Sequence, residues 1–461
     1  MDERILNTLK DLRAYALGKG YDISLAYHEE DSYLMRFANS AISLNTNEHL
    51  IRLEVTAFDD RKRATVEMIT DLSKLDEMKK AIDSAAEMVV HVQSLNYQPT
   101  ITEFTETFID ESGYDDSLAQ LSNSERLDYF NQASAGLETD LIKLSGIFAN
   151  GSTTMAQINT RSEHIQYFKF SDAQVTVVIS HSALKWEVQS EQSAWRKSDL
   201  KPASLHDDLA FLVERYTHDT PQQLALGSYD IVFGPAATAD MLNFMNFIGF
   251  NGGMMKRGYS FLSEEKVGQQ VLSDQFTLID DAGRLDTFPF KRDFTGRLRG
   301  DHSLFTKGVF NGYIWSQDDA DEFGTQATSH TVPHKSLVMA GGVKDVSSLR
   351  DLVKLTHEKD ILYIPFLHYM NIVNPSRALI TGSSRFGALL LKKDGSMVVP
   401  YNVRLTQSLL DVFGEKVAWL SKATEPYNTS SSYGARNPSS IVVPTFMCVR
   451  DLEISHSNSS Y

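Results

Sequence analysis

Apolar residues recur every three or four positions at the start of the chain, which predicts an amphipathic helix. The pattern ends at Lys19-Gly20, where a glycine can take the left-handed conformation that closes a helix. Alternating apolar and polar residues follow, and they predict strands of a half-buried sheet at 23–27, 33–37 and 50–58. The chain is therefore expected to open with a helix that packs on a sheet.

Capping patterns predict two more helices in the first half. Ser73 with Asp76 has the spacing of a capping box, and the apolar face that follows reaches Val89. Ser122 with Glu125 has the same spacing and predicts a helix to about residue 135.

Strands and one further helix are expected in the rest of this half. Segment 97–116 lacks a helical period, so it is interpreted as a crossing strand and a connector. The β-branched and aromatic run 142–180 predicts several antiparallel strands, and 203–216 predicts a helix. The polar segment 218–227 contains a proline and is the expected domain boundary.

The second half begins with a strand at 229–233 that ends in a Gly-Pro break, followed by a helix at 237–247. Short strands with glycine turns dominate afterwards, interrupted by helices expected near 347–355 and 405–420. Helices and antiparallel strands without regular alternation predict an α+β fold.

Two domains are expected within this fold. Residues 1–220 would form an α/β-type domain with a mixed sheet and helices, and residues 228–461 a domain rich in antiparallel strands.

Composition narrows the function. The chain has 60 acidic and 44 basic residues and a net charge of -16, which disfavours nucleic acid as a direct ligand. The single cysteine, Cys448, excludes an intrachain disulfide and favours a reducing compartment. The acidic N-terminus lacks the pattern of a signal peptide, and no run approaches the roughly 20 apolar residues of a membrane span. A cytoplasmic protein without a membrane partner is the expectation.

A series of short motifs resembles the TldD/PmbA family. The N-terminal part is the segment Arg36-Phe-Ala-Asn-Ser-Ala-Ile-Ser, followed by a strand at 51–53 and an alanine-rich helix. The C-terminal motifs occur in the order of the family: Val232-Phe-Gly-Pro, Gly258-Tyr-Ser-Phe-Leu, Leu278-Ile-Asp-Asp, Lys307-Gly-Val-Phe-Asn-Gly-Tyr, Asn374-Pro-Ser, Thr381-Gly-Ser-Ser-Arg-Phe-Gly and Val443-Pro. Each motif is weak by itself, and their order carries the resemblance.

The resemblance also indicates a missing metal site. Members of the TldD branch carry His-Glu-x-x-x-His on the helix after the first C-terminal strand, and a downstream Cys-Gly completes their zinc site. The corresponding positions here are Asn243, Phe244 and Ile248, with Tyr433 at the cysteine. Phenylalanine and isoleucine side chains have no donor atom for zinc and cannot move a proton. The resemblance therefore implies a PmbA/TldE-like or related metal-free subunit, without a catalytic residue or cofactor of its own.

What such a subunit does is implied by the family alone. It would pair with a zinc-bearing TldD-type partner in a metalloprotease that acts on unstructured peptides. Relatives mature a peptide antibiotic or degrade an antitoxin, and an older label for the family is modulator of DNA gyrase.

A peptide groove is one further candidate site. Methionine and phenylalanine adapt to varied partners, so the residues around the second-half helix could line such a groove, although a core role is favoured. Two arginines nearby could contact a peptide carboxylate. The candidate residues are Met241, Met245, Met254, Met255, Arg297 and Arg299.

Other chemistry is weighed against plainer roles. His330 and His334 are weak metal candidates, because Pro333 between them disfavours a helix. The segment 28–31, His-Glu-Glu-Asp, is interpreted as a solvated acidic turn, and Cys448 as a small core residue. Ser383-Ser384 is interpreted as part of a hydrogen-bonded turn.

Three functions stay open at this point. The first is an inert partner subunit of a TldD-type protease. The second is an active metallopeptidase or other hydrolase with unrecognised ligands, for which His302, His330 and His334 are the nearby candidates. The third is a self-associating protein, such as a homodimer, that captures peptides along a sheet edge.

Overall fold

The computed structural model describes residues 2–293, 295–330, 335–355, 357–430 and 436–458. The predicted first helix is confirmed as α1 (Glu3–Lys19), which Asp2 caps and Gly20 ends with a φ of 73°. Helix α2 (Leu75–His91) is also confirmed, but its predicted capping box is wrong. Its N-cap is Lys74, and the amide of Ser73 instead donates to Asp71, because the chain turns before the helix begins.

Four long strands form the floor of the first half. They are β1 (Asp22–Ala38), β2 (Ala41–Asp59), β5 (Ile142–Asn159) and β6 (Ser162–His181). The segments 23–27 and 33–37 belong to the one strand β1, so the acidic turn predicted at 28–31 is wrong. These polar residues continue the strand because they pair with β2 and β5 and find polar partners above the sheet. The antiparallel strands predicted over 142–180 are confirmed, but they are two long strands, β5 and β6, that form one hairpin.

The first sheet contains every strand of the first half that the structure describes. Its order is β3-β2-β1-β5-β6-β4, with β7 also paired to β6. All pairs are antiparallel except the one between β4 and β6. The remaining elements are β3 (Lys62–Thr70), β4 (Phe108–Gly113), β7 (Glu187–Ala194), α3 (Asp116–Ala119), α4 (Asn123–Ala133) and α5 (Pro202–His218). The capping box predicted from Ser122 and Glu125 is confirmed at the start of α4.

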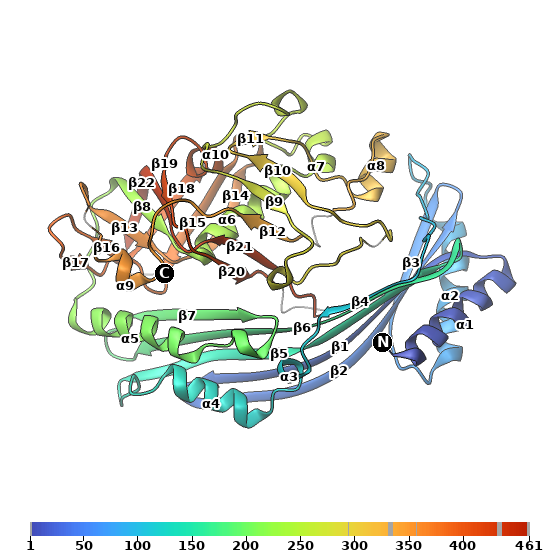
Figure 1. Ribbon diagram of the computed structural model, residues 1–461, viewed down its shortest axis with the longest axis horizontal. Coiled ribbons are helices and arrows are strands. Elements are labelled where there is room, and N and C mark those ends of the chain that lie inside the picture. Colours follow the sequence, from blue (N-terminus) through green and yellow to red (C-terminus); the bar gives the residue numbers. More distant parts are fainter. Residues whose placement is uncertain (1, 294, 331–334, 356, 431–435, 459–461) are drawn as a thin grey trace.

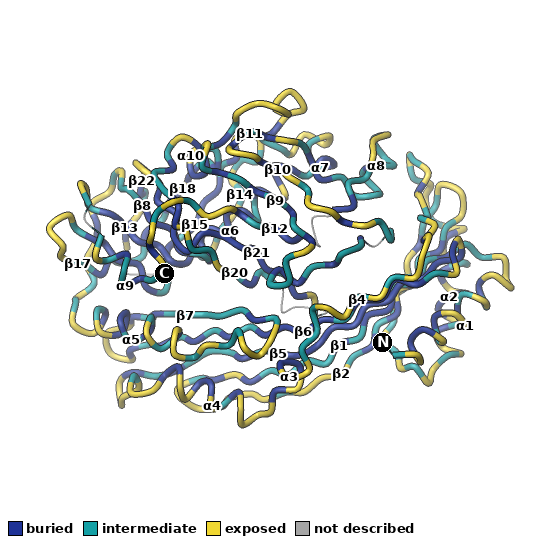
Figure 2. Tube along the Cα trace, viewed as in Figure 1, coloured by how far each residue is buried: buried dark blue, intermediate teal, exposed yellow. Residues whose placement is uncertain are grey.

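The helices cover the two ends of this curved sheet. Helices α1 and α2 pack at one end, and α4 and α5 lie at the other (Figure 1). Figure 2 shows that the middle of the sheet is buried, whereas the outer length of β2 is exposed. The C-terminal half lies over the sheet.

Two sheets make up the second half within the described residues. One has the order β11-β10-β9-β12-β21-β20, and the other β14-β15-β18-β22-β8-β13-β16-β17, with β19 paired to β22. The strands of the first are β9 (Leu278–Asp280), β10 (His302–Thr306), β11 (Val309–Phe310), β12 (Leu337–Met339), β20 (Thr424–Asn428) and β21 (Ser440–Pro444). The strands of the second are β8 (Gly227–Phe233), β13 (Ile361–Ile364), β14 (Phe366–Asn374), β15 (Leu379–Arg385), β16 (Leu389–Leu391), β17 (Met397–Val398), β18 (Asn402–Ser408), β19 (Val417–Leu420) and β22 (Met447–Asn458).

The described part of this half contains few α-helices. They are α6 (Pro235–Ile248), α7 (Gly252–Lys256), α8 (Gln317–Phe323), α9 (Leu349–Leu352) and α10 (Leu409–Val412). The α+β fold is confirmed. The division into residues 1–220 and 228–461 stays a prediction, although the strands of the two halves join different sheets.

The helix predicted at 405–420 is wrong. The segment contains the end of β18, the four residues of α10 and the strand β19. Leu405, Leu409 and Val412 have helical spacing, but they belong to successive elements that each bury a side chain in one core. The helix expected near 347–355 is reduced to α9.

Cys448 and the serine pair lie in strands. Cys448 is 3% exposed in β22, and burial raises the pKa of its thiol to about 12. The turn predicted for Ser383-Ser384 is wrong, because both residues belong to β15 and the Ser384 hydroxyl accepts from the Val403 amide at 2.9 Å. No helix in the described ranges is long and apolar enough to span a membrane.

Candidate functional site

Helix α6 carries the residues that the family resemblance places at the zinc motif. Pro235 lies in its first turn, where backbone N–H groups have no partner within the helix, so the N–H that proline lacks is not needed. Ile248 is 2% exposed and Phe244 packs against the core, while Asn243 is half-buried. Of the three side chains, only that of Asn243 presents polar atoms.

A lysine ammonium lies against Asn243. Lys335 Nζ donates a hydrogen bond to Asn243 Oδ1 and lies 5.7 Å from the centroid of the Phe247 ring. Lys335 is 8% exposed, and burial lowers the pKa of its ammonium to about 8. The side-chain oxygen at the first histidine position is therefore engaged by a largely buried lysine.

The methionines predicted for a peptide groove lie mostly in the core. Met241 and Met245 are fully buried on α6, which places them away from any surface groove. Met255 is partly buried against the same core, and Met254 is half-buried in α7. The apolar stripe of α6 was visible in the sequence, but its direction depended on which sheets cover it.

Arg299 and His330 share one buried carboxylate. Arg299 Nη2 donates to Asp280 Oδ1 at 2.8 Å, and His330 Nδ1 lies 2.6 Å from Asp280 Oδ2. Burial acts to raise the pKa of Asp280, but Arg299 and His330 outweigh it and hold the pKa below its ordinary value. Arg299 thus serves an internal ion pair and not a surface groove, while Arg297 is half-buried.

Two candidate positions, His334 and Tyr433, lie outside the described residues. Within the part of the chain that the structure describes, no three His, Cys, Asp or Glu side chains are placed so that they could hold a metal ion. His330 is therefore seen only as a partner of Asp280 and as a neighbour of the His302 ring, whose centroid is 5.0 Å away.

A cleft lies between the floor sheet and the C-terminal half. Its cavity of about 190 Å³ is lined by β7 and α5 from the first half, and by the start of α6, β20 and the β21–β22 connection from the second. Carboxyl groups reach it from three elements: Glu191 from β7, Asp208 from α5 and Glu425 from β20. Asp240 of α6 lies near enough to Glu191 to repel it.

The carboxyl groups at this cleft are disfavoured as anions. Burial and then the charge of Asp240 raise the pKa of Glu191 to about 8, and burial raises the pKa of Asp240 to about 7. The side chain of Glu425 is exposed, so the loss of solvation in the cleft, followed by repulsion from Asp208, raises its pKa less than that of Glu191. Burial and the neighbouring Asp207 raise the pKa of Asp208 to about 6. Such shifts are common at sites that bind or transfer charge.

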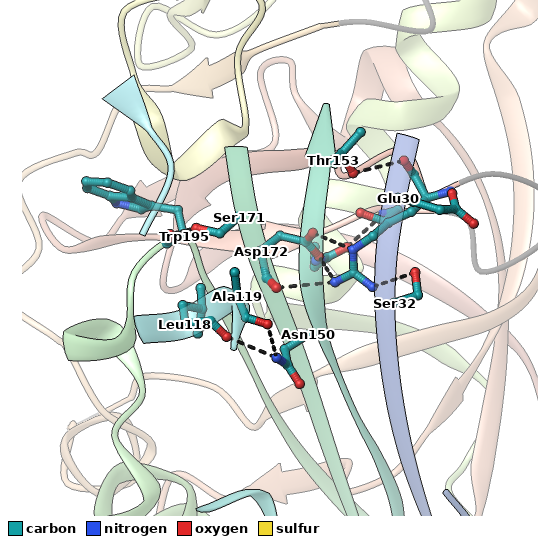
Figure 3. A network of polar contacts seen from close by, with 12 residues as sticks. Glu30, Ser32, Leu118, Ala119, Asn150, Thr153, Ser171, Asp172 and Trp195 are labelled. Atoms are coloured by element: carbon teal, nitrogen blue, oxygen red, sulfur yellow. Dashed lines mark hydrogen bonds and ion pairs between the residues drawn. The ribbon is translucent and has the colours of Figure 1, made fainter. Parts of the chain in front are cut away.

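Arg436 closes the other end of the interface between the two halves. Its guanidinium donates to both oxygens of Asp172, at 2.8 and 2.7 Å, and its backbone amide donates to Glu30. Figure 3 shows Asp172 on β6 and Glu30 and Ser32 on β1, the two strands on either side of β5 in the floor sheet. Gly151 allows this approach, because a Cβ there would lie 3.2 Å from Arg436 Cζ and only 1.9 Å from the Asp31 carbonyl oxygen.

A second polar cluster supports the same strands from below. Arg126 is 1% exposed and donates to Asn150 Oδ1 at 2.8 Å. Asn150 Nδ2 in turn donates to the carbonyl of Leu118 at 3.0 Å (Figure 3). Ser171 donates to the carbonyl of Trp195 at 2.9 Å (Figure 3). These bonds satisfy polar groups in the middle of the sheet and fix the strands that line the cleft.

Sequence reasoning did not single out the carboxyl groups of the cleft or Arg436. Isolated acids in a strand or helix usually face solvent, so none of them stands out as a motif. One signal exists at β7, where Gln189, Glu191 and Ser193 alternate on one face. Nothing in the sequence shows that this face meets β20.

The fold and sequence together define the family. A profile of the PmbA/TldA metallopeptidase C-terminal domain matches residues 226–456. The chain belongs to this PmbA/TldD family and is therefore a metallopeptidase-related protein. No curated protein matches it.

Solved structures share the fold over nearly the whole chain. TldE from Thermococcus kodakarensis is 14% identical with a TM-score of 0.78, and the match covers 98% of this chain and 100% of that one. A candidate modulator of DNA gyrase from Bacteroides thetaiotaomicron is 17% identical with a TM-score of 0.76, covering 99% of each chain. A similar protein from Thermotoga maritima is 14% identical with a TM-score of 0.75, covering 97% of this chain and 99% of that one. At these identities the likeness describes the fold alone.

Proposed function

We propose that this chain is a TldE/PmbA-like subunit that has no metal site of its own and that presents unstructured peptide to a zinc-bearing TldD-type partner. The observation that carries the proposal is that α6 offers no side chain able to bind zinc at the positions of the family motif. Phe244 and Ile248 offer no donor atom, and the oxygen of Asn243 already accepts from Lys335. These residues do not fit zinc, so no catalytic step is assigned to them.

The charge of Lys335 adds to this argument. A buried ammonium beside Asn243 repels a divalent cation, so the position disfavours metal by electrostatics as well as by ligand type. The cleft between the two halves is open enough to take part of an extended chain, and the proposal assigns peptide binding to it.

The test compares the purified chain alone, its TldD-type partner alone and the two together. Zinc content is measured by mass spectrometry, and cleavage of an unfolded polypeptide is followed with and without a chelator. We expect well below one zinc per chain in this protein, no cleavage by it alone, and faster cleavage by the mixture than by the partner. Chelator-sensitive cleavage by this chain alone would overturn the proposal.

An exposed sheet edge favours self-association as the second candidate function. Residues 41–50 of β2 pair only with β1 among the described residues, because β3 begins its pairing at Ile51. Ile42 and Leu44 on this edge are 47% and 43% exposed. An unpaired edge of this kind can take a strand from another chain. Light scattering with and without the TldD-type partner decides between a homodimer and a mixed complex.

A further inference from the structure

Two sheet edges face each other across the cleft. Among the described residues, β7 is paired only with β6, and β20 only with β21. Residues of both strands line the same cavity, and the two strands are in contact. A ligand in the cleft is therefore flanked by the first half on one side and the second half on the other.

The cleft gathers carboxyl groups with few matching cations. In the described part of the chain, no lysine or arginine acts on the carboxyl groups of Glu191 and Glu425, and only Arg350 acts on Asp208. The neighbouring hollow, which shares these three carboxyl groups, is also lined by Arg196 and Lys201. Glu191 Oε2 accepts from Gln189 Nε2 at 3.1 Å, but none of the three carboxyl groups has a lysine or arginine bonded to it among the described residues. A cation that enters between the strands would therefore find carboxyl oxygens without a bonded cation.

An unpartnered amide points to a ligand independently of this charge. Asn428 lines the cleft and is 6% exposed, yet its Nδ2 has no hydrogen-bond partner in the described structure. The orientation of the amide is fixed, because Asn428 Oδ1 accepts from the Ser430 amide at 2.8 Å. Ser193 Oγ, on the opposite strand, is also buried without a partner. A buried polar group without a hydrogen-bond partner raises the free energy of the folded state, and a peptide carbonyl would accept the hydrogen bond that Asn428 Nδ2 can donate.

Aromatic rings complete the walls of the cavity. Tyr363, Phe366, Tyr427 and Phe446 line it beside the three carboxyl groups. An ammonium or guanidinium group placed between aromatic rings and carboxylates can make cation–π contacts as well as ion pairs.

We propose that the cleft selects peptide segments that carry a lysine or arginine side chain. The cationic head lies among Glu191, Asp208 and Glu425, and Asn428 donates to a carbonyl of the peptide backbone. The inference rests on the proposed peptide-binding function and names the class of peptide that the subunit takes.

The test uses short fluorescent peptides that are acetylated at the N-terminus and amidated at the C-terminus. One contains a central arginine, and its twin contains citrulline, which has the same shape without the charge. Binding to the full-length chain is measured by anisotropy. We expect the arginine peptide to bind about tenfold more tightly than the citrulline peptide, the scale of one charge pair. A citrulline peptide with a free N-terminus shows whether a terminal amine can replace the side chain.

Variants place the effect in the cleft. Glu191→Gln combined with Glu425→Gln should remove most of the preference for arginine, while Glu87→Gln, an exposed acid on α2, should leave it unchanged. Asn428→Ala should weaken both peptides equally, because it removes a donor to the backbone. Circular dichroism confirms that each variant is folded.

The outcomes separate the two proposals. Equal binding of the arginine and citrulline peptides overturns the charge selection and leaves peptide binding intact. A preference that survives the double variant places the cation elsewhere and also overturns the inference. If no peptide binds to the chain, alone or with its TldD-type partner, the proposed peptide-presenting function fails with it.

Discussion

Replacing Arg436 with methionine tests a buried ion pair between the two halves. Methionine replaces the aliphatic part of the arginine side chain but has no guanidinium, so Asp172 loses both charge-assisted hydrogen bonds. The side chains of this ion pair are 11% and 7% exposed, which makes it a largely buried pair. Removing one partner of such a pair costs about 3–5 kcal/mol, because the other charge stays buried without compensation.

The cost should depend on pH. Burial already raises the pKa of Asp172 in spite of Arg436, and without Arg436 the pKa rises further. A carboxyl group whose pKa is raised in the folded state stabilises that state below its unfolded pKa of 3.8 and loses this contribution as the pH rises. The variant is therefore expected to lose most stability near pH 8 and least near pH 4.5, where Asp172 can take up a proton.

Urea unfolding at both pH values, followed by near-ultraviolet circular dichroism, measures this loss. Adding Asp172→Asn to Arg436→Met should restore part of the stability, since no buried charge is left unpaired. The control is Arg161→Met, which breaks a pair whose side chains are 56% and 36% exposed and should cost less than about 1 kcal/mol. A loss below about 1 kcal/mol for Arg436→Met, or one that does not change with pH, would refute the reasoning.

Three further changes are predicted. Glu191→Gln should raise the unfolding free energy by about 1–2 kcal/mol at pH 9 and have little effect at pH 4. The raised pKa of Glu191 stabilises the folded state fully only below the unfolded pKa of 4.5, and this contribution is lost as the pH rises to about 8. The full shift corresponds to about 5 kcal/mol, and the partial exposure of Glu191 reduces the expected gain. Thermal melts across this range check the prediction, and an effect that does not change with pH contradicts it. Lys335→Met should stabilise the chain more at pH 6 than at pH 10. Burial lowers the pKa of Lys335 to about 8, so the charged ammonium at pH 6 destabilises the folded state, whereas the neutral amine at pH 10 does not. Equal effects at both pH values in urea titrations would count against a buried ammonium. Cys448 should react with a thiol reagent only after unfolding, since its sulfur is buried and its pKa is raised to about 12; rapid labelling of the native chain would show that β22 opens.

The sequence by itself determined the local elements and the family. Periodic apolar residues located α1, α2 and α5, and the spacing of Ser122 and Glu125 located the start of α4, because these signals act within one or two turns of a helix. The order of short motifs was sufficient for the TldD/PmbA resemblance, which the match over residues 226–456 confirms.

The tertiary structure decided where polar residues find partners. The pattern of segment 28–31 predicts a turn, but in the fold Arg436, more than 400 residues away in sequence, supplies partners to its polar groups and the segment continues a strand. The pattern of residues 405–420 predicts a helix, but in the fold three successive elements of this segment contribute side chains to one core. The cleft depends in the same way on β7 meeting β20. Long-range contacts of this kind leave no local period in the sequence, because each partner obeys only the pattern of its own strand or helix.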